Sequence, residues 1–161
     1  MKLRHLFFAC SGVFVMMFSL LLLVVIVFSD EEDGGSDGNL IYGGVSVSQE
    51  VLAHKPMLEK YAREYGIEEY LNVLLAIIQV ESGGTLEDVM QSSESLGLPP
   101  NSLSTEESIK QGCKYFSELL AAAETKGCDL NSVIQSYNYG GGFLDYVAGR
   151  GKKYTFELAE S

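Results

Sequence analysis

Glu81 is the residue of this sequence best suited to donate a proton to a reacting group. It directly follows a stretch predicted to be helical, Glu68–Val80, whose side chains are apolar almost all round. Such a helix is buried, and burial disfavours the ionised form of a carboxyl group. The partial negative charge at a helix C-terminus acts in the same direction. Both effects raise the pKa of Glu81 toward neutral, as a general acid requires. The alternative is a solvated helix-end carboxylate without a chemical role.

Two glycines, Gly83 and Gly84, follow the candidate acid. One glycine is enough to stop a helix. A pair also removes two side chains, which lets the backbone of a polymer approach the carboxylate. The pair therefore favours a chemical role for Glu81 over the solvated alternative.

Asp88 is the natural second carboxylate. In glycosidases a separation of about 5 Å suits a covalent nucleophile, whereas roughly 6.5–9.5 Å leaves room for an attacking water. The glycine break means that helix geometry does not give this distance. The alternative for Asp88 is a cap for the turn over 89–92. The next residues carry donors and acceptors suited to sugar hydroxyl and acetamido groups, or form a plain loop: Gln91, Ser92, Ser93, Glu94 and Ser95.

A third polar segment, Tyr137–Asn138–Tyr139, stands where an amphipathic stripe meets three glycines. Tyr137 continues the apolar stripe, so core packing is its default role. Asn138 lies beside the glycine-rich opening and can present its amide to a substrate or to Glu81. Alone, this segment is a weak signal.

Helical patterns account for the rest of the domain. Pro56 is expected to kink or split a helix predicted over Ser48–Tyr65. No alternating strand pattern of useful length occurs, so the sequence predicts an all-α fold. Further helices are predicted from a capping box at Ser104 and Glu107 to a stop at Gly127, from a cap at Asp129 onward, and over Phe143–Ala148.

The N-terminal segment predicts a membrane anchor. Leu6–Phe28 is an uncharged apolar run long enough to cross a bilayer core of about 30 Å. Lys2 and Arg4 precede it and acidic residues follow, so we expect a cytoplasmic N-terminus and an extracellular remainder. The alternative is a cleaved signal peptide and a secreted domain. We therefore predict an anchor over 1–29, an acidic Gly/Ser/Asp-rich linker over 30–44 and one folded domain over 45–161.

Composition excludes several functions. The formal net charge of −11 argues against nucleic acid, whose binding needs clustered Lys and Arg. An acidic surface also gives no attraction toward an anionic polymer, so recognition must come from hydrogen bonds and aromatic faces in a cleft.

Cys113 lies inside a predicted helix that holds it too far from Cys128 for a disulfide. His54 and these cysteines lack metal-ligand spacing, so no metal site is predicted.

Together the three segments resemble the motif set of soluble lytic transglycosylases and goose-type lysozymes: Glu81–Ser82, then Met90–Gln91, then Tyr137–Asn138 with a glycine two residues on. The resemblance is closer to the lysozyme-like domains of pneumococcal vaccine antigen A and of CwlT-type wall hydrolases of conjugative elements in Gram-positive bacteria. Their signature Asp-Val-Met-Gln-Ser-Ser-Glu-Ser stands unbroken here from Asp88 to Ser95.

The resemblance implies a lysozyme-like helical domain that acts as an N-acetylmuramidase. The bond cleaved would be the β-1,4 bond between N-acetylmuramic acid and N-acetylglucosamine in peptidoglycan. Glu81 would be the acid and Asp88 a second catalytic carboxylate, with neither metal nor cofactor. The residues expected to bind the glycan strand are Ser82, Gln91, Ser92, Ser93, Glu94, Tyr137, Asn138 and Tyr139.

Related domains continue with another helix and an aromatic segment, whereas this sequence stops at Ser161, so we expect a domain that is short at its C-terminus. The leading hypothesis is a membrane-anchored muramidase that opens the wall locally, for example for a conjugation or secretion apparatus. One alternative is a lytic transglycosylase that forms 1,6-anhydro ends and has no need of Asp88. The other is a non-catalytic surface module that binds the wall or a partner protein.

Overall fold

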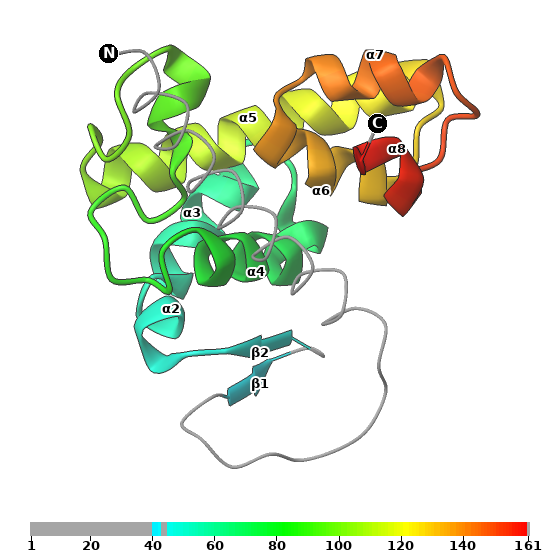
Figure 1. Ribbon diagram of the computed structural model, residues 1–161. Coiled ribbons are helices and arrows are strands. Elements are labelled where there is room, and N and C mark those ends of the chain that lie inside the picture. The colour runs from blue at the N-terminus through cyan, green and yellow to red at the C-terminus, as the bar shows by residue number, and fades with distance from the viewer. Residues whose placement is uncertain (1–39, 43–44, 161) are drawn as a thin grey trace, which may run out of the picture.

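Helices form almost all of the regular structure in the part of the chain that the computed structural model describes, residues 40–42 and 45–160 (Figure 1). The predicted all-α fold is confirmed in its main part. In chain order the elements are β1 (Leu40–Tyr42), β2 (Val45–Val47), α2 (Gln49–Ala53), α3 (Lys55–Glu64), η1 (Glu68–Tyr70), α4 (Leu71–Glu81), η2 (Ser92–Leu96), α5 (Thr105–Lys126), α6 (Leu130–Tyr139), α7 (Gly142–Ala148) and α8 (Phe156–Glu160).

The central helix is α4, as its uninterrupted apolar pattern predicts. Every side chain from Val73 to Ile78 is buried, which is the arrangement expected of a helix that is apolar all round. The first turn of the predicted segment is a separate 3₁₀ helix, η1, and α4 ends at Glu81. The candidate acid therefore stands where the buried helix meets the loop that follows it.

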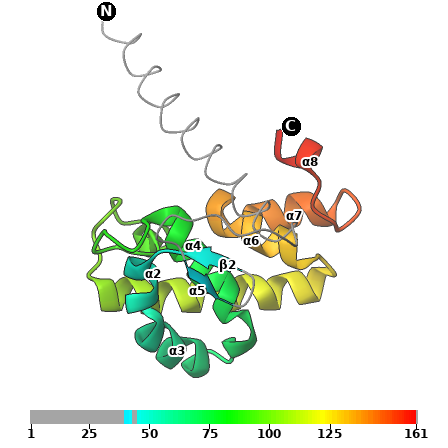
Figure 2. The same ribbon diagram turned by 90° about the horizontal axis from the view of Figure 1, so that it is seen from below.

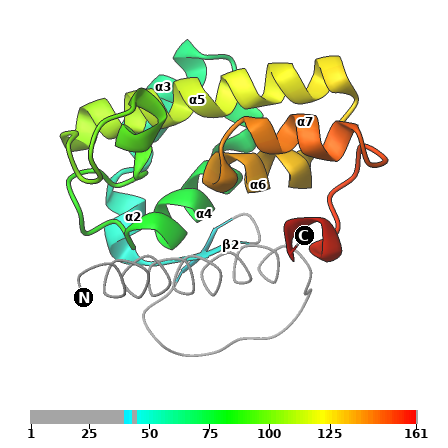
Figure 3. The ribbon, with the colours of Figure 1, turned by 45° about the horizontal axis from the view of Figure 1, so that its top comes forward.

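The long helix α5 runs the length of the domain, with α3 against one part of it and α6 and α7 against another (Figure 3). Its predicted ends are confirmed. The Glu107 carboxylate accepts from the backbone amide of Ser104 at 3.1 Å, as in a capping box. At the other end Gly127 adopts a φ of +72°. The Asp129 carboxylate then accepts from the amide of Ser132 at 3.0 Å and caps α6. At the end of the domain opposite α2 and α3 lies α8 (Figure 2).

Pro56 splits the first predicted helix, as expected. His54 separates α2 from α3, and Pro56 sits in the first turn of α3. A proline is tolerated there because the amides of the first turn have no partner within the helix. The α2 helix is therefore free to turn away and pack against α4.

The prediction of no strands was wrong at the start of the domain. β1 pairs antiparallel with β2, Leu40 opposite Val47 and Tyr42 opposite Val45. Strands of three residues are too short to show a measurable alternation in the sequence. β1 also lies inside the predicted linker, 30–44, so this part of the linker is paired with the domain. Val47 is wholly buried, and β2 packs on α4.

The predicted anchor, Leu6–Phe28, lies outside the described residues. Among residues 40–42 and 45–160, no helix is long and apolar enough to cross a membrane.

The two glycines after α4, Gly83 and Gly84, have different structural roles. Gly83 has a φ of +61° and Gly84 a φ of +78°, a region that favours glycine. A Cβ at Gly84 would lie 2.7 Å from the carbonyl carbon of Glu50 and 2.7 Å from the amide nitrogen of Val51. A Cβ at Gly83 would meet only the Gln79 side chain, at 3.9 Å. Gly84 thus allows α2 to approach the end of α4. The sequence analysis had interpreted the glycine pair as access for a polymer and did not predict this packing.

Alanine substitutions distinguish the structural roles of the two glycines. Gly83→Ala is expected to destabilise the chain by about 1 kcal/mol, because it places a Cβ in the left-handed region. Gly84→Ala adds a clash with backbone atoms that cannot rotate away, and is expected to cost about 2–5 kcal/mol in total. Urea unfolding of both variants measures the two values. Equal costs would contradict the close packing of α2 on Gly84.

Candidate functional site

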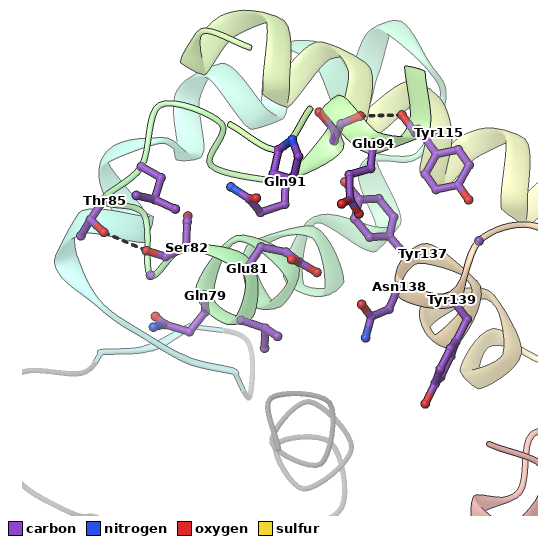
Figure 4. Close-up of a pocket in the computed structure, with 17 residues that line it drawn as sticks. Gln79, Glu81, Ser82, Thr85, Gln91, Glu94, Tyr115, Tyr137, Asn138 and Tyr139 are labelled. Carbon is purple, nitrogen blue, oxygen red and sulfur yellow. Dashed lines mark hydrogen bonds between the residues drawn. The ribbon is translucent and has the colours of Figure 1, made fainter. Parts of the chain in front are cut away.

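A cleft of about 920 Å³ opens beside the C-terminal end of α4, within the size range of small-molecule sites. Its walls come from α4, the loop that follows it, η2, α5 and the end of α6 (Figure 4). The structure brings together most of the residues that the sequence assigned to a site, although their three segments lie far apart in the chain. The predicted residues that line the cleft are Glu81, Ser82, Gln91, Ser92, Glu94, Tyr137, Asn138 and Tyr139.

Glu81 is the last residue of α4 and its side chain is mostly buried at the cleft wall. Burial raises the pKa of its carboxyl from 4.5 to about 7, and the negative charges of Glu94 and Asp88 act in the same direction. A carboxyl group with this pKa is about half protonated at pH 7, whereas an ordinary glutamate is almost fully ionised there. It can therefore donate a proton to a ligand in the cleft.

Asp88, the expected second carboxylate, is not among the residues that line the cleft. Its side chain is wholly buried. One carboxylate oxygen accepts from the amide of Ser92 at 2.9 Å and from the hydroxyl of Ser108 at 2.6 Å. The other accepts from the amide of Ser93 at 3.2 Å. The capping role that the sequence left open is therefore the one that its contacts support, because these bonds hold the start of η2.

Ser93 is also placed away from the cleft. It is wholly buried and does not line the cavity. Its position follows from the geometry of η2, in which consecutive residues point in different directions. Ser92 and Glu94 reach the cleft, while Ser93 between them points into the protein.

Ser82 and Gln91 line the cleft and also shape its loop. The Ser82 hydroxyl donates to the carbonyl oxygen of Val89 at 2.7 Å. The side-chain amide of Gln91 donates to the carbonyl oxygen of Asp88 and to the side chain of Asn101, both at 2.8 Å. Both N–H groups of Gln91 are thereby used, which leaves its carbonyl oxygen as the atom able to accept from a ligand.

Tyr137 connects the cleft to the core, and Asn138 and Tyr139 continue the same wall opposite Glu81 (Figure 4). The Tyr137 hydroxyl donates to the carbonyl oxygen of Met90 at 3.1 Å. Burial, followed by the charge of Glu81, holds the pKa of Tyr137 well above 10, so its hydroxyl keeps its proton. The core-packing interpretation is confirmed as well, because its ring contacts that of Phe116.

Sequence reasoning missed about a third of the residues that line the cleft. Tyr115 had an available signal, because it precedes Phe116 on α5 and a second aromatic residue there points to another face. Gln79 had one too, as a polar residue within a mostly apolar helix. The loop residues carried no such signal in the sequence, because loops have no regular periodicity of apolar and polar residues. The lining residues that were missed are Gln79, Val80, Thr85, Leu86, Pro100 and Tyr115.

No group of three or more His, Cys, Asp and Glu side chains is placed to hold a metal ion within the described residues. Cys113 and Cys128 are both free thiols. The polar side chains that line the cleft carry carboxyl, amide, hydroxyl and phenol groups.

Comparison with known proteins gives consistent matches. A family model described as lysozyme-like matches residues 48–161. The bifunctional muramidase/DL-endopeptidase CwlT of Bacillus subtilis (strain 168) is 44% identical over 126 residues, which are 78% of this chain and 37% of CwlT. A pneumococcal vaccine antigen A homolog of Streptococcus pyogenes serotype M3 is 41% identical over 112 residues, 69% of this chain and 56% of the homolog.

A solved structure is also similar. It is a protein described as similar to lipoprotein, NLP/P60 family, from Staphylococcus aureus subsp. aureus Mu50. It is 77% identical with a TM-score of 0.70, and the match covers 71% of this chain and 39% of that chain. The chain therefore spans between 37% and 56% of the length of the two curated relatives named above.

Glu81→Gln tests the raised pKa through stability. Because the pKa of Glu81 rises from 4.5 to about 7 on folding, the folded chain holds this proton more tightly than the unfolded chain. The resulting stabilisation is complete below pH 4.5 and is lost as the pH rises through about 7. Glu81→Gln cannot ionise. We expect it to match the original chain within about 0.5 kcal/mol at pH 4 and to exceed it by about 1–3 kcal/mol at pH 8.

Urea titrations at the two pH values provide the measurement. Glu87→Gln is the matched control, because Glu87 is an exposed carboxylate of the same loop that does not line the cleft. If the difference between Glu81→Gln and the original chain were the same at both pH values, the raised pKa would be contradicted.

Proposed function

Because the chain belongs to the lysozyme-like family, we propose that it is a peptidoglycan hydrolase of the muramidase type. Its substrate is the β-1,4 bond between N-acetylmuramic acid and N-acetylglucosamine. The observation that carries the proposal is Glu81, a mostly buried carboxyl with a pKa of about 7 on the wall of a cleft. The name of the relative CwlT, which includes muramidase, supports the same activity.

Glu81 performs the acid step. Its proton passes to the O4 oxygen of N-acetylglucosamine while the bond from that oxygen to C1 of N-acetylmuramic acid breaks. The developing charge on the sugar resembles an oxocarbenium ion. Water then bonds to C1 and loses a proton, which completes hydrolysis. The proposed reaction uses no cofactor.

The opposite wall binds the strand. Asn138 and Gln91 are placed to bond acetamido and hydroxyl groups, and the ring of Tyr139 offers a face to a sugar. Ser82, Ser92 and Tyr137 also line the cavity, although the hydroxyls of Ser82 and Tyr137 already donate within the protein. Sites of this composition, apolar with a few convergent polar groups, are typical of ligand clefts.

The domain acts outside the cell membrane, tethered by the apolar segment Leu6–Phe28. The charge asymmetry around that segment is the support for this topology. A conjugation or secretion apparatus as partner remains a prediction from the sequence resemblance.

Mass spectrometry of the products tests the activity. The purified full-length chain is expected to release fragments with reducing N-acetylmuramic acid ends from Gram-positive peptidoglycan. Glu81→Gln is expected to lower the rate by about 10²–10⁴-fold, whereas Glu87→Gln retains it. The rate of the original chain should fall as the pH rises through about 7, because the protonated fraction of Glu81 falls.

Two other outcomes would redirect the proposal. Ends in the 1,6-anhydro form would show a lytic transglycosylase. Binding to glycan strands without any cleavage, by a chain shown to be folded, would favour a wall-binding module.

A further inference from the structure

The Lys and Arg side chains of the described residues fall into two groups. Six of them form ion pairs with Asp or Glu: Lys55, Lys60, Arg63, Lys110, Lys114 and Lys126. Within the part of the chain that the structure describes, the other three take part in no such pair, and they share one exposed loop after α7: Arg150, Lys152 and Lys153. We call residues 150–153 the basic loop. It concentrates unpaired positive charge in a chain whose formal net charge is −11.

Two carboxylates in the neighbourhood of the basic loop have partners elsewhere. Asp129 and Asp145 both act electrostatically on the Cys128 thiol, as Lys152 does, so they belong to the same end of the domain. Asp145 pairs with Lys126. Asp129 accepts from the amide of Ser132 at 3.0 Å and from that of Tyr154 at 3.2 Å. Exposed cations without a nearby counter-charge attract anions from solution.

The basic loop is held in place although its charges are exposed. The amide of Lys152 donates to the carbonyl oxygen of Val147 at 3.0 Å, and its carbonyl oxygen accepts from the amide of Asp129 at 3.2 Å. The Arg150 guanidinium lies over the ring of Tyr146, 3.6 Å from its centre, and donates to the Tyr146 carbonyl oxygen at 3.2 Å. Charges that are positioned in advance lose less conformational entropy when they bind a ligand.

A row of aromatic rings joins the basic loop to the cleft. Tyr139 lines the cleft (Figure 4). Its ring stacks on that of Phe143 with centres 5.2 Å apart, and Phe143 stacks on Tyr146 with centres 6.0 Å apart. Arg150 covers the far end of the row. The row follows α7, a helix of seven residues and therefore about 10 Å long. One short helix thus separates the cations from the cleft.

We propose that Arg150, Lys152 and Lys153 form a second binding site, outside the cleft, for the carboxylates of the peptide stems on a wall glycan strand. The inference rests on the proposed function and names the form of the strand that the chain takes, peptide-bearing rather than peptide-free. Stems branch from the N-acetylmuramic acid residues and end in free carboxylates, so a strand held in the cleft carries such groups along α7. The planar guanidinium of Arg150 keeps most of its N–H groups for a carboxylate.

The cleft has no comparable site for an anion. Among the described residues that line it, the only charged ones are Glu81 and Glu94. A stem carboxylate is repelled there and attracted by the basic loop, so the cleft takes the sugars and the loop takes the peptide. Anionic lipid headgroups have a charge of the same sign, but the aromatic row that leads from the loop to the cleft favours the strand.

Binding without cleavage tests the site. The full-length chain with Glu81→Gln is titrated, by fluorescence anisotropy, into labelled strands that carry their stems and into strands freed of stems by an amidase. Adding Arg150→Gln, Lys152→Gln and Lys153→Gln is expected to weaken binding of the peptide-bearing strands about 10-fold. Binding of the stem-free strands should change by less than about twofold. Added salt should narrow the difference, because exposed charges are screened.

A matched triple variant controls for net charge. Lys60→Gln, Arg63→Gln and Lys110→Gln also remove three positive charges, but from cations that already pair with glutamates. This variant should bind both kinds of strand as the parent does. Equal urea unfolding midpoints of the parent and the basic-loop variant would show that loss of binding does not come from loss of the fold.

The cleaving chain gives an independent readout. With Glu81 intact, the three basic-loop substitutions should raise KM for peptide-bearing strands about 10-fold and leave kcat unchanged, because the site binds substrate and transition state equally. The pH dependence of kcat should also be unchanged.

Three results would overturn the proposal. One is unchanged affinity of the basic-loop variant for peptide-bearing strands. Another is equal weakening for both kinds of strand, which would assign the loop to sugar binding. The third is slower trypsin cleavage at these residues in phosphatidylglycerol than in phosphatidylcholine vesicles together with unchanged strand binding, which would assign them to a lipid surface. Failure of the original chain to release reducing ends would refute the proposed function instead, so the two failures are distinguishable.

Discussion

The shape of the cleft depends on the buried carboxylate of Asp88. It accepts hydrogen bonds from two consecutive backbone amides, of Ser92 and Ser93, and from the hydroxyl of Ser108 on α5. Bonds to an ionised acceptor are stronger than neutral ones, and a buried donor that loses its acceptor is costly. The turn between α4 and η2 is therefore tied to α5. This connection fixes where η2 stands relative to Glu81, although Asp88 itself does not reach the cleft.

A second connection joins the same loop to α6. Met90 is wholly buried, and its carbonyl oxygen accepts from the Tyr137 hydroxyl at 3.1 Å. Gly112 makes room for this contact, because a Cβ there would lie 2.5 Å from the Met90 sulfur and 2.8 Å from the Tyr137 hydroxyl oxygen. The amide of Met90 donates to the hydroxyl of Ser108 at 3.0 Å. Much of the segment from Asp88 to Ser95 therefore holds the two walls of the cleft together.

The sequence predicted the helices better than the directions of the site residues. Apolar periodicity and end signals located α4, α5 and α6, because those signals are local. The buried role of Asp88 depends on Ser108, twenty residues later on another helix, and no local pattern encodes that contact. For the same reason, sequence order alone did not separate Ser93, which points inward, from Glu94, which points outward. The β1 strand was not predicted, because three residues are too few to show the alternation of apolar and polar side chains that marks a strand.

In the proposed reaction, the charge of the cleft favours the transition state over the bound substrate. Among the described residues that line it are two carboxyl groups and no cation, and the chain carries a formal net charge of −11. A wall polymer with carboxylates of its own gains nothing electrostatically from entering such a cleft, so the proposed binding depends on amide, hydroxyl and aromatic groups. As C1 becomes positively charged, however, the carboxyl groups of the cleft would attract it. Interactions that strengthen only in the transition state raise kcat. An acidic surface, which is unfavourable for wall binding, is thus compatible with wall cleavage.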